Sequence, residues 1–157
     1  MGQEVVKTFN TLADLAACAG QVVATSDWTT ITQAQIQQFA DATGDQQWIH
    51  TDPVRAQDGP FGSTIAHGFL TLSLIPQFFD SALHITQSRM GVNYGLNKVR
   101  FVAPVPVGSR LRGQLKLVST EPIEPAGSLQ MVWEVTVERE GSAKPVCVAE
   151  SIVRRYV

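Results

Sequence analysis

The segment Ile65-Ala-His-Gly-Phe-Leu-Thr-Leu-Ser-Leu-Ile-Pro-Gln-Phe-Phe-Asp-Ser-Ala-Leu83 is the one long apolar stretch of this chain. Its apolar residues lie on nearly every side of a helix, as expected for a helix that other parts of the protein enclose. Pro76 lies inside the segment and predicts a kink or a break, because proline has no N–H to donate within a helix. We therefore expect a long buried helix at the centre of the fold.

The sequence after this segment predicts β-strands. Apolar and polar residues alternate in three stretches, which are residues 111–117, 131–137 and 146–152. Turn-forming residues at 125–127 and 140–142 predict hairpin connections between them. An earlier apolar stretch, 99–102, leads into a proline-broken connection at 103–108. Because strands that follow helices are typical of an α+β fold, we expect an antiparallel sheet wrapped around the buried helix.

The sequence before the segment predicts two shorter helices. The first has an apolar face and ends at Gly20. Thr32 caps the second, and Gly44 ends it as a left-handed residue. Neither a linker nor an internal repeat interrupts the chain, so residues 1–157 are expected to form a single domain.

The composition narrows the classes of function. Hydrophobic residues make up 44% of the 157 residues, which indicates a globular protein with a core. A net charge of −2 leaves no basic surplus for a nucleic-acid backbone. The first residues lack a signal-peptide pattern, and no apolar stretch is long enough to span a membrane. The two cysteines, Cys18 and Cys147, argue against a disulfide framework or a structural zinc site. We expect a soluble cytoplasmic protein without nucleic-acid or membrane partners.

Asp45 and His50 are the residues best suited to acid–base chemistry. They stand five residues apart in an irregular stretch that follows the second helix. A carboxylate and an imidazole at this spacing can converge on one bound water, and Trp48 and Ile49 between them would exclude bulk solvent. The alternative is that Asp45 is a turn residue and His50 a surface histidine. The nearby carboxylate of Asp41 is expected to be solvated.

Gly68 is expected in the first turn of the buried helix, where backbone N–H groups have no helical partner. Such an N–H can hold a developing oxyanion, and a glycine lets a ligand approach the backbone closely. The alternative is a simple helix start that Ser63 or Thr64 caps. We expect His67 to pack or to orient its neighbours, and His84 to complement the far end of the same helix. The three histidines show no metal-ligand spacing.

Two stretches of this sequence carry a family resemblance. Ala40-Asp-Ala-Thr-Gly-Asp-Gln-Gln-Trp-Ile-His-Thr-Asp-Pro53 is followed by Gly59-Pro-Phe-Gly-Ser-Thr-Ile-Ala-His-Gly-Phe-Leu-Thr-Leu-Ser-Leu74. The D-x-x-x-x-H element joined to an A-H-G helix start resembles the MaoC-like dehydratase family, the (R)-specific enoyl-CoA hydratases also called hydratase 2. Residues 93–101 (Asn-Tyr-Gly-Leu-Asn-Lys-Val-Arg-Phe) with 104–108 look like the NodN-type branch of that family. The resemblance covers roughly residue 22 to the C-terminus.

The resemblance implies a hot-dog fold, in which a curled antiparallel sheet wraps around a long central helix. It also implies a homodimer in which the acyl-CoA enters near the subunit interface. The family's catalytic pair maps to Asp45 and His50, and the N–H that holds the thioester oxygen maps to Gly68. The implied reaction adds water reversibly to trans-2-enoyl-CoA to give (R)-3-hydroxyacyl-CoA, with no metal or redox cofactor. Pro76 stands where a well-known bacterial branch has a serine, so its chain-length preference cannot be carried over.

Two other functions stay open at this point. A hot-dog acyl-CoA thioesterase would use a carboxylate to activate water against the thioester carbon. A non-catalytic acyl-binding subunit could share the same fold. Asp45 and His50 together with the A-H-G helix start favour the hydratase, and both residues are intact. The sequence does not distinguish coenzyme A from acyl carrier protein as the carrier, or identify the general base of the pair.

Overall fold

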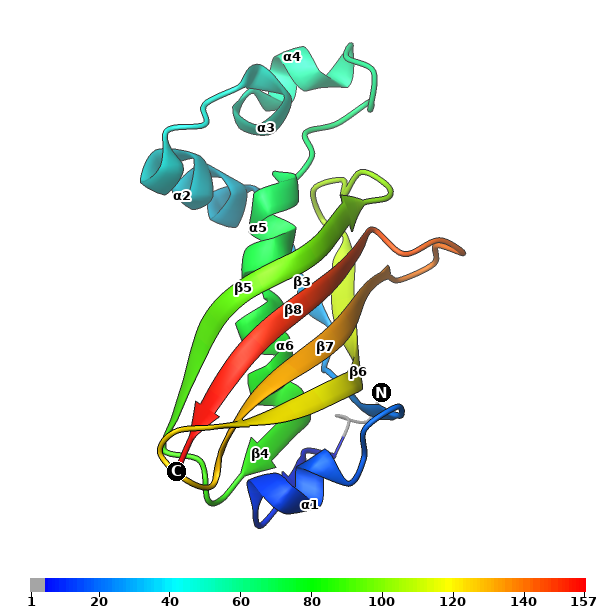
Figure 1. Ribbon diagram of the computed structural model, residues 1–157. Coiled ribbons are helices and arrows are strands. Elements are labelled where there is room, and N and C mark those ends of the chain that lie inside the picture. Colours follow the sequence, from blue (N-terminus) through cyan, green and yellow to red (C-terminus); the bar gives the residue numbers. More distant parts are fainter. Residues whose placement is uncertain (1–4) are drawn as a thin grey trace.

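The computed structural model describes residues 5–157, and Figure 1 shows the order of its helices and strands. The first part of the chain contains β1 (Lys7–Phe9), α1 (Leu12–Ala16), β2 (Val22–Thr25), β3 (Thr29–Thr30), α2 (Gln33–Thr43), α3 (Trp48–Thr51) and α4 (Pro53–Gln57). The second part contains α5 (Gly68–Ser73), α6 (Ile75–Ala82), β4 (Leu83–Ile85), β5 (Met90–Phe101), β6 (Arg110–Ile123), β7 (Ser128–Arg139) and β8 (Cys147–Tyr156).

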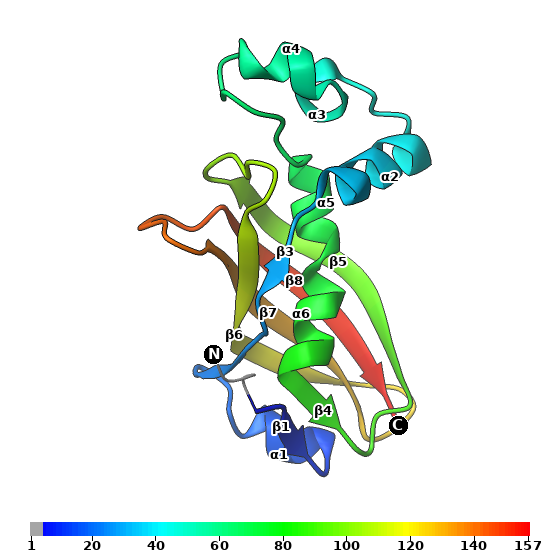
Figure 2. The same ribbon diagram turned by 180° about the vertical axis from the view of Figure 1, so that it is seen from behind.

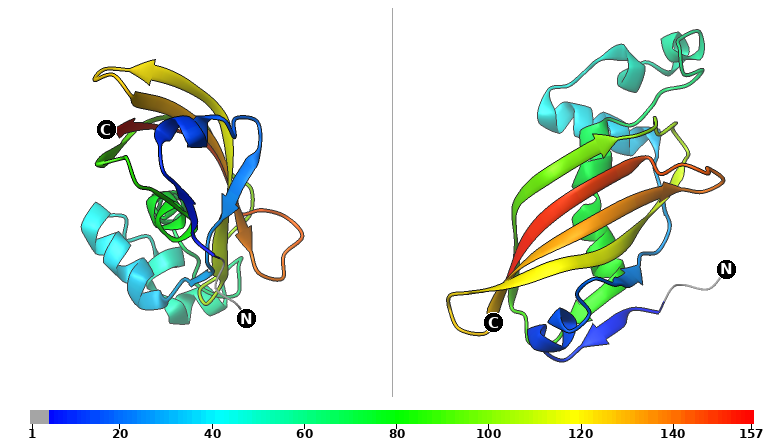
Figure 3. Two further views of the ribbon diagram at one scale, coloured as in Figure 1. Left: turned by 90° about the horizontal axis from the view of Figure 1, so that it is seen from below. Right: turned by 45° about the vertical axis from the view of Figure 1, so that its right-hand side comes forward.

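The long strands form an antiparallel sheet in the order β2-β6-β7-β8-β5, and β3 also pairs with β6. This sheet curls around α5 and α6, as the views in Figure 2 and Figure 3 show. A separate parallel pair, β1 with β4, lies at the lower end of α6 in Figure 2. The expected α+β hot-dog architecture is therefore confirmed. Within residues 5–157, β8 is the single partner of β5, so the outer side of β5 is a free edge.

The core lies between α6 and the inner face of the sheet. Ile75, Phe78 and Phe79 of α6 are buried there. The rings of Phe79 and Trp133 of β7 pack edge to face, with centroids 5.0 Å apart. Gly113 of β6 lies against Phe78, and a Cβ atom on the glycine would stand 2.9 Å from the Phe78 side chain. A residue without a side chain is therefore what lets the helix approach this strand.

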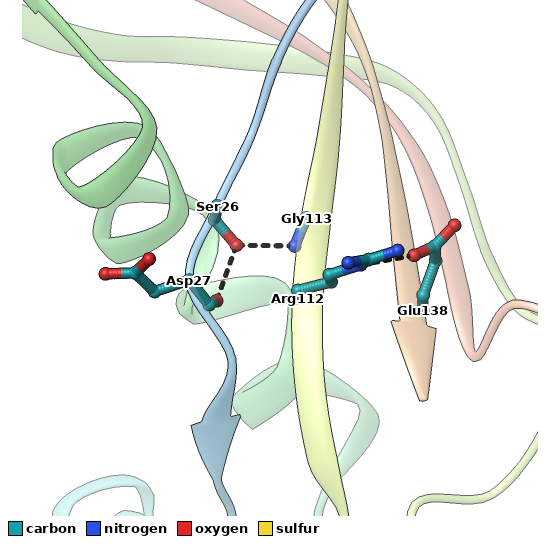
Figure 4. Close-up of polar contacts among 5 residues, drawn as sticks. All are labelled: Ser26, Asp27, Arg112, Gly113 and Glu138. Atoms are coloured by element: carbon teal, nitrogen blue, oxygen red, sulfur yellow. Dashed lines mark hydrogen bonds and ion pairs between the residues drawn. The ribbon is translucent and has the colours of Figure 1, made fainter. Parts of the chain in front are cut away.

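Buried Ser26 fastens the chain between β2 and β3 to the sheet. Its hydroxyl oxygen accepts the Gly113 N–H at 2.8 Å (Figure 4). Its N–H donates to the carbonyl of Gly113, also at 2.8 Å. The same hydroxyl donates to the carbonyl of Asp27 at 2.9 Å. Arg112 and Glu138 form an ion pair of 2.7 Å between β6 and β7. These contacts fix the end of the sheet from which the chain continues into α2.

The structure confirms one local expectation and corrects two. The central segment forms two helices that meet at Leu74. Pro76 lies in the first turn of α6, where a residue needs no N–H because no carbonyl within the helix would accept it. The expected break is thus confirmed, and it lies at Leu74, two residues before Pro76. His84 lies in β4 and not at a helix end, because α6 ends at Ala82 and the next residue is extended. The first helix ends at Ala16, four residues before Gly20.

The segment from α2 to the start of α5 lies beyond one end of the sheet, above α5 in Figure 1. As predicted, the Thr32 side chain caps α2 by accepting the Gln35 N–H at 3.1 Å, and Gly44 ends the helix with a φ of 85°. The N–H of Ile65 then donates to the carbonyl of Ile49 at 3.0 Å, which ties the returning chain to α3. Among the described residues, every helix is too short or too polar to cross a membrane.

Candidate active site

Asp45 lies in the exposed loop between α2 and α3, directly after the left-handed Gly44. Its carboxylate accepts the N–H of Gln47 at 3.3 Å, a bond that leaves most of its hydrogen-bonding capacity unused. Its main-chain carbonyl accepts a hydrogen bond from Nε2 of His67 at 3.0 Å. The carboxylate is thus accessible to water, while the backbone behind it is held from the start of α5.

His50 lies on the short helix α3 and is 6% exposed, so the alternative of a surface histidine is wrong. Its Nδ1 lies 2.7 Å from the carbonyl oxygen of Ile65, and because a carbonyl only accepts, Nδ1 carries the hydrogen. Nε2 is left to act on other groups. Gln33 donates to the His50 carbonyl at 2.8 Å, and the Thr64 hydroxyl donates to Gln33 at 2.5 Å. These bonds fix both the ring and the backbone of His50.

The structure brings Asp45, His50 and His67 together from separate parts of the chain. One carboxylate oxygen of Asp45 and one ring nitrogen of each histidine lie within 4.8 Å of one another. The two imidazole rings stack with centroids 3.8 Å apart and an angle of 23° between their planes. The Asp45 carboxylate and the ring nitrogen of His50 are close enough to share one water molecule, since hydrogen bonds of about 2.8 Å can reach from one oxygen to both groups.

Burial lowers the pKa of His50 below its ordinary value of 6.5. The hydrogen bond to the Ile65 carbonyl opposes this shift, because it favours the protonated ring. The interaction with His67 lowers the pKa of His50 further, and the negative charge of Asp45 raises it. The net effect favours an imidazole whose Nε2 lone pair is available at neutral pH.

The three-residue cluster has the donor types of a metal site, although the sequence spacing gave no sign of one. Its geometry fits a metal poorly. Metal ligands direct their lone pairs at a common point, whereas the lone pairs of two stacked rings lie in nearly parallel planes. The arrangement therefore suits a hydrogen-bonded water better than an ion. The expectation of a site without a metal or cofactor stays a prediction.

Gly68 is the first residue of α5, as expected, and its N–H therefore lacks an acceptor within the helix. Neither Ser63 nor Thr64 caps this helix: the residue at the cap position is His67, and its side chain makes no capping bond. A cavity of about 310 Å³ opens beside Gly68, with apolar walls that include Phe101. The alternative, in which Ser63 or Thr64 caps the helix, is therefore wrong.

Sequence reasoning missed several polar residues around this site. Thr71 lines the same cavity and is 2% exposed, and its hydroxyl has no hydrogen-bond partner among residues 5–157. Gln33 and Thr64 hold His50, although neither has a spacing that marks it in the sequence. Asp41 lies exposed on α2 and accepts bonds from two glutamine side chains, so its expected solvation is confirmed.

Comparisons with known proteins agree on one family. Residues 14–139 match the MaoC like domain. The chain is 58% identical over 149 residues to 3-hydroxyacyl-thioester dehydratase Z of Mycobacterium tuberculosis, covering 95% of this chain and 98% of the relative. It is 46% identical over 143 residues to Nodulation protein N of Rhizobium leguminosarum bv. viciae, covering 90% and 88%.

A solved structure gives the same result for the fold. The R-hydratase PhaJ1 of Pseudomonas aeruginosa superposes with a TM-score of 0.65 at 26% identity, over 86% of this chain and 79% of that one. Together with the domain match and the two relatives, this likeness confirms the MaoC-like and NodN-type resemblance of the sequence. The chain is a hydro-lyase, and it belongs to the MaoC-like dehydratase family.

Proposed function

We propose that this protein is an (R)-specific enoyl-CoA hydratase, which adds water reversibly to trans-2-enoyl-CoA to give (R)-3-hydroxyacyl-CoA. One observation carries the proposal. The carboxylate of Asp45 and a ring nitrogen of His50 converge within 4.8 Å, at the end of the sheet where α5 begins with Gly68. Gly68 begins α5 directly after His67, which contacts Asp45 and His50, and its N–H has no acceptor within the helix. This arrangement supports the action of the pair and the N–H on one substrate. The names of the dehydratase and R-hydratase relatives support the same reaction type.

In the proposed mechanism, the thioester oxygen accepts the N–H of Gly68. Asp45 and Nε2 of His50 hold one water, which attacks C3 of the enoyl group as the pair removes its proton. Electron density moves through C2 onto the thioester oxygen, and the enolate charge is stabilised by the Gly68 N–H. Loss of such a donor costs about 2.7–4 kcal/mol in other enzymes. The pair then returns a proton to C2 from the same side, which completes the addition without a cofactor.

The substrate is expected to lie in the cavity beside Gly68. Its volume of about 310 Å³ is at the lower end of the range for small-molecule sites, and its walls are largely apolar. Thr71, on the next turn of α5, lines the same cavity, and its buried hydroxyl has no hydrogen-bond partner among residues 5–157. A thioester that accepts this hydroxyl would satisfy a buried polar group that is otherwise unpaired.

We further propose a homodimer that forms along β5. Alternate apolar side chains of this free edge strand are exposed: Met90, Val92, Tyr94 and Leu96. An exposed apolar edge of this length invites pairing with another strand. Two copies of one edge can pair antiparallel about a two-fold axis, which gives a closed assembly. The cytoplasmic location stays a prediction from the sequence.

Incubation of the purified protein with crotonyl-CoA tests the proposed reaction. We expect the enoyl absorbance to fall with no release of free thiol, and chiral analysis to give (R)-3-hydroxybutyryl-CoA. Release of free coenzyme A would identify a thioesterase instead. No reaction across a series of chain lengths, on either coenzyme A or acyl carrier protein, combined with measurable acyl binding, would identify a binding subunit.

A further inference from the structure

His67 has no part in the proposed mechanism, yet it contacts both members of the proposed catalytic pair. Its Nε2 lies 3.0 Å from the main-chain carbonyl of Asp45, and its ring stacks on His50 at 3.8 Å. Phe39 of α2 packs against the same imidazole, with centroids 4.9 Å apart. The histidine is 2% exposed and directly precedes Gly68. It therefore joins α2, the Asp45 loop, α3 and the start of α5.

We propose that His67 is a positioning residue, which holds Asp45 and His50 in one arrangement through its Nε2–H bond and its stacked ring. This inference rests on the proposed function of that pair. Asp45 needs such a constraint, because its loop is exposed and, among residues 5–157, its carboxylate accepts a single long bond, from the Gln47 N–H at 3.3 Å. A hydrogen bond from a buried ring to the carbonyl of the same residue limits where the carboxylate can lie.

The unused nitrogen of His67 argues against a role in packing alone. A carbonyl only accepts, so Nε2 carries the hydrogen and Nδ1 is left with a bare lone pair. Nδ1 is buried and has no hydrogen-bond partner among residues 5–157. A ring kept for packing alone would need neither nitrogen. The imidazole is therefore explained by the hydrogen bond that its Nε2–H makes to Asp45.

Two substitutions separate the bond from the stacked ring. His67→Phe keeps an aromatic ring against His50 and removes the donor. His67→Gln keeps an N–H donor near the position of Nε2 and removes the ring. The matched control is His84→Gln, because His84 is exposed on β4 and lies far along the chain from the site. For each variant we would measure kcat, KM, the thermal midpoint and the pH dependence of kcat/KM with crotonyl-CoA.

We expect His67→Phe to lower kcat about 100-fold, as for a reacting group displaced by about an ångström, with KM little changed. Its thermal midpoint should stay near that of the wild type, because the new ring still packs against Phe39 and His50 and one hydrogen bond is lost. The acid limb of the pH profile should move to higher pH, because the interaction with His67 contributes to the lowered pKa of His50. His67→Gln should lose less activity than His67→Phe, and His84→Gln should match the wild type.

Two results would overturn the inference. One is wild-type kcat and an unshifted acid limb in His67→Phe. The other is a loss of activity that follows a loss of folded protein in both His67 variants, which would assign the residue to folding alone. A failure of the proposed function is recognised separately, since the wild-type protein would then not hydrate crotonyl-CoA. The proton–nitrogen correlation spectrum of the wild type would still report whether His67 carries its hydrogen on Nε2.

Discussion

The ring of Phe101, the last residue of β5, lies against Gly68, the first residue of α5. A Cβ atom on the glycine would stand 2.8 Å from Cδ2 of the ring, closer than side chains normally approach. Phe101 is 43% exposed and also packs edge to face on Phe69, with ring centroids 5.7 Å apart. Gly68 is therefore constrained by the sheet as well as by the proposed approach of the thioester, and a test of its role must separate the two.

We expect Gly68→Val to abolish hydration and also to lower the thermal midpoint, since the new side chain displaces the Phe101 ring. The informative protein is the double variant Gly68→Ala with Phe101→Ala, in which the ring that would meet the Cβ atom is absent. Its turnover should stay far below that of the Phe101→Ala single variant, with similar thermal midpoints. If the double variant recovers the activity of the single one, Gly68 serves packing and the oxyanion donor lies elsewhere.

Asp45→Asn and His50→Gln should each lower hydration by about 10²–10⁴-fold, as for the loss of a positioned acid or base. The double variant should be little worse than the more damaged single variant, because the pair acts as a unit on one water. Asp41→Asn is the matched control, since Asp41 is an exposed carboxylate on the neighbouring helix. Fully multiplicative losses in steady-state assays would show that Asp45 and His50 do not share a water.

The lowered pKa of His50 predicts the pH dependence of catalysis. Because burial holds this pKa below 6.5, kcat/KM should stay level through pH 6.5 and fall only at lower pH. We would measure kcat/KM between pH 4.5 and 8, a range that spans the ordinary histidine pKa of about 6.5. An acid limb at or above pH 6.5 would contradict the lowered pKa.

Stability should depend on the same group. Below pH 6.5 the unfolded chain binds a proton at this histidine that the folded protein does not, so the contribution of neutral His50 is complete above pH 6.5. It is lost as the pH falls from 6.5 through the lowered pKa. The thermal midpoint of the wild type should therefore fall more steeply in this window than that of His50→Gln. Parallel curves for the two proteins would show that His50 does not couple folding to pH.

A charge on the exposed edge of β5 should separate the proposed dimer. Leu96→Asp places a carboxylate on a side chain that is 46% exposed, and pairing of two edges would bury two such charges. We expect the wild type to be a dimer and the variant a monomer in light scattering at micromolar concentration. Val118→Asp on β6, where the valine is 41% exposed, is the matched control and should stay dimeric. A wild-type monomer with full activity would rule out the dimer.

Local signals in the sequence predicted those elements that local chemistry determines. Thr32 and Gly44 mark the two ends of α2 by a side-chain cap and a left-handed residue, and both act as predicted. The alternation of apolar residues identified β6, β7 and β8, because one face of each strand is buried against the helices. The continuous apolar segment 65–83 predicted the buried helix and placed Gly68 in its first turn.

The sequence did not predict the features that depend on contacts between residues far apart in the chain. β5 begins at Met90, well before the predicted stretch at 99–102. Apolar residues alternate in its first half, but glycine and asparagine stand between them, and these residues are depleted in strands. The site shows the same limit. Asp45 and His50 are close in sequence. The third member of the cluster, His67, lies beside them because the chain before it is tied to α3 by the hydrogen bond from the Ile65 N–H to the Ile49 carbonyl. The spacing of these three residues along the chain does not predict their contact.

The segment that carries Asp45 and His50 leaves the sheet after β3 and returns to it at α5, so both of its ends lie at the same end of the sheet. Among the described residues, every strand of the sheet and both central helices lie outside this segment, which adds Ile36 of α2 to the core. A change of chemistry in such a protein can therefore arise by replacing residues 44–63 alone, which leaves the sheet, the central helices and Ile36 as they are. The same division lets an engineer graft residues 44–63 from a relative and test for a new substrate without redesigning the core.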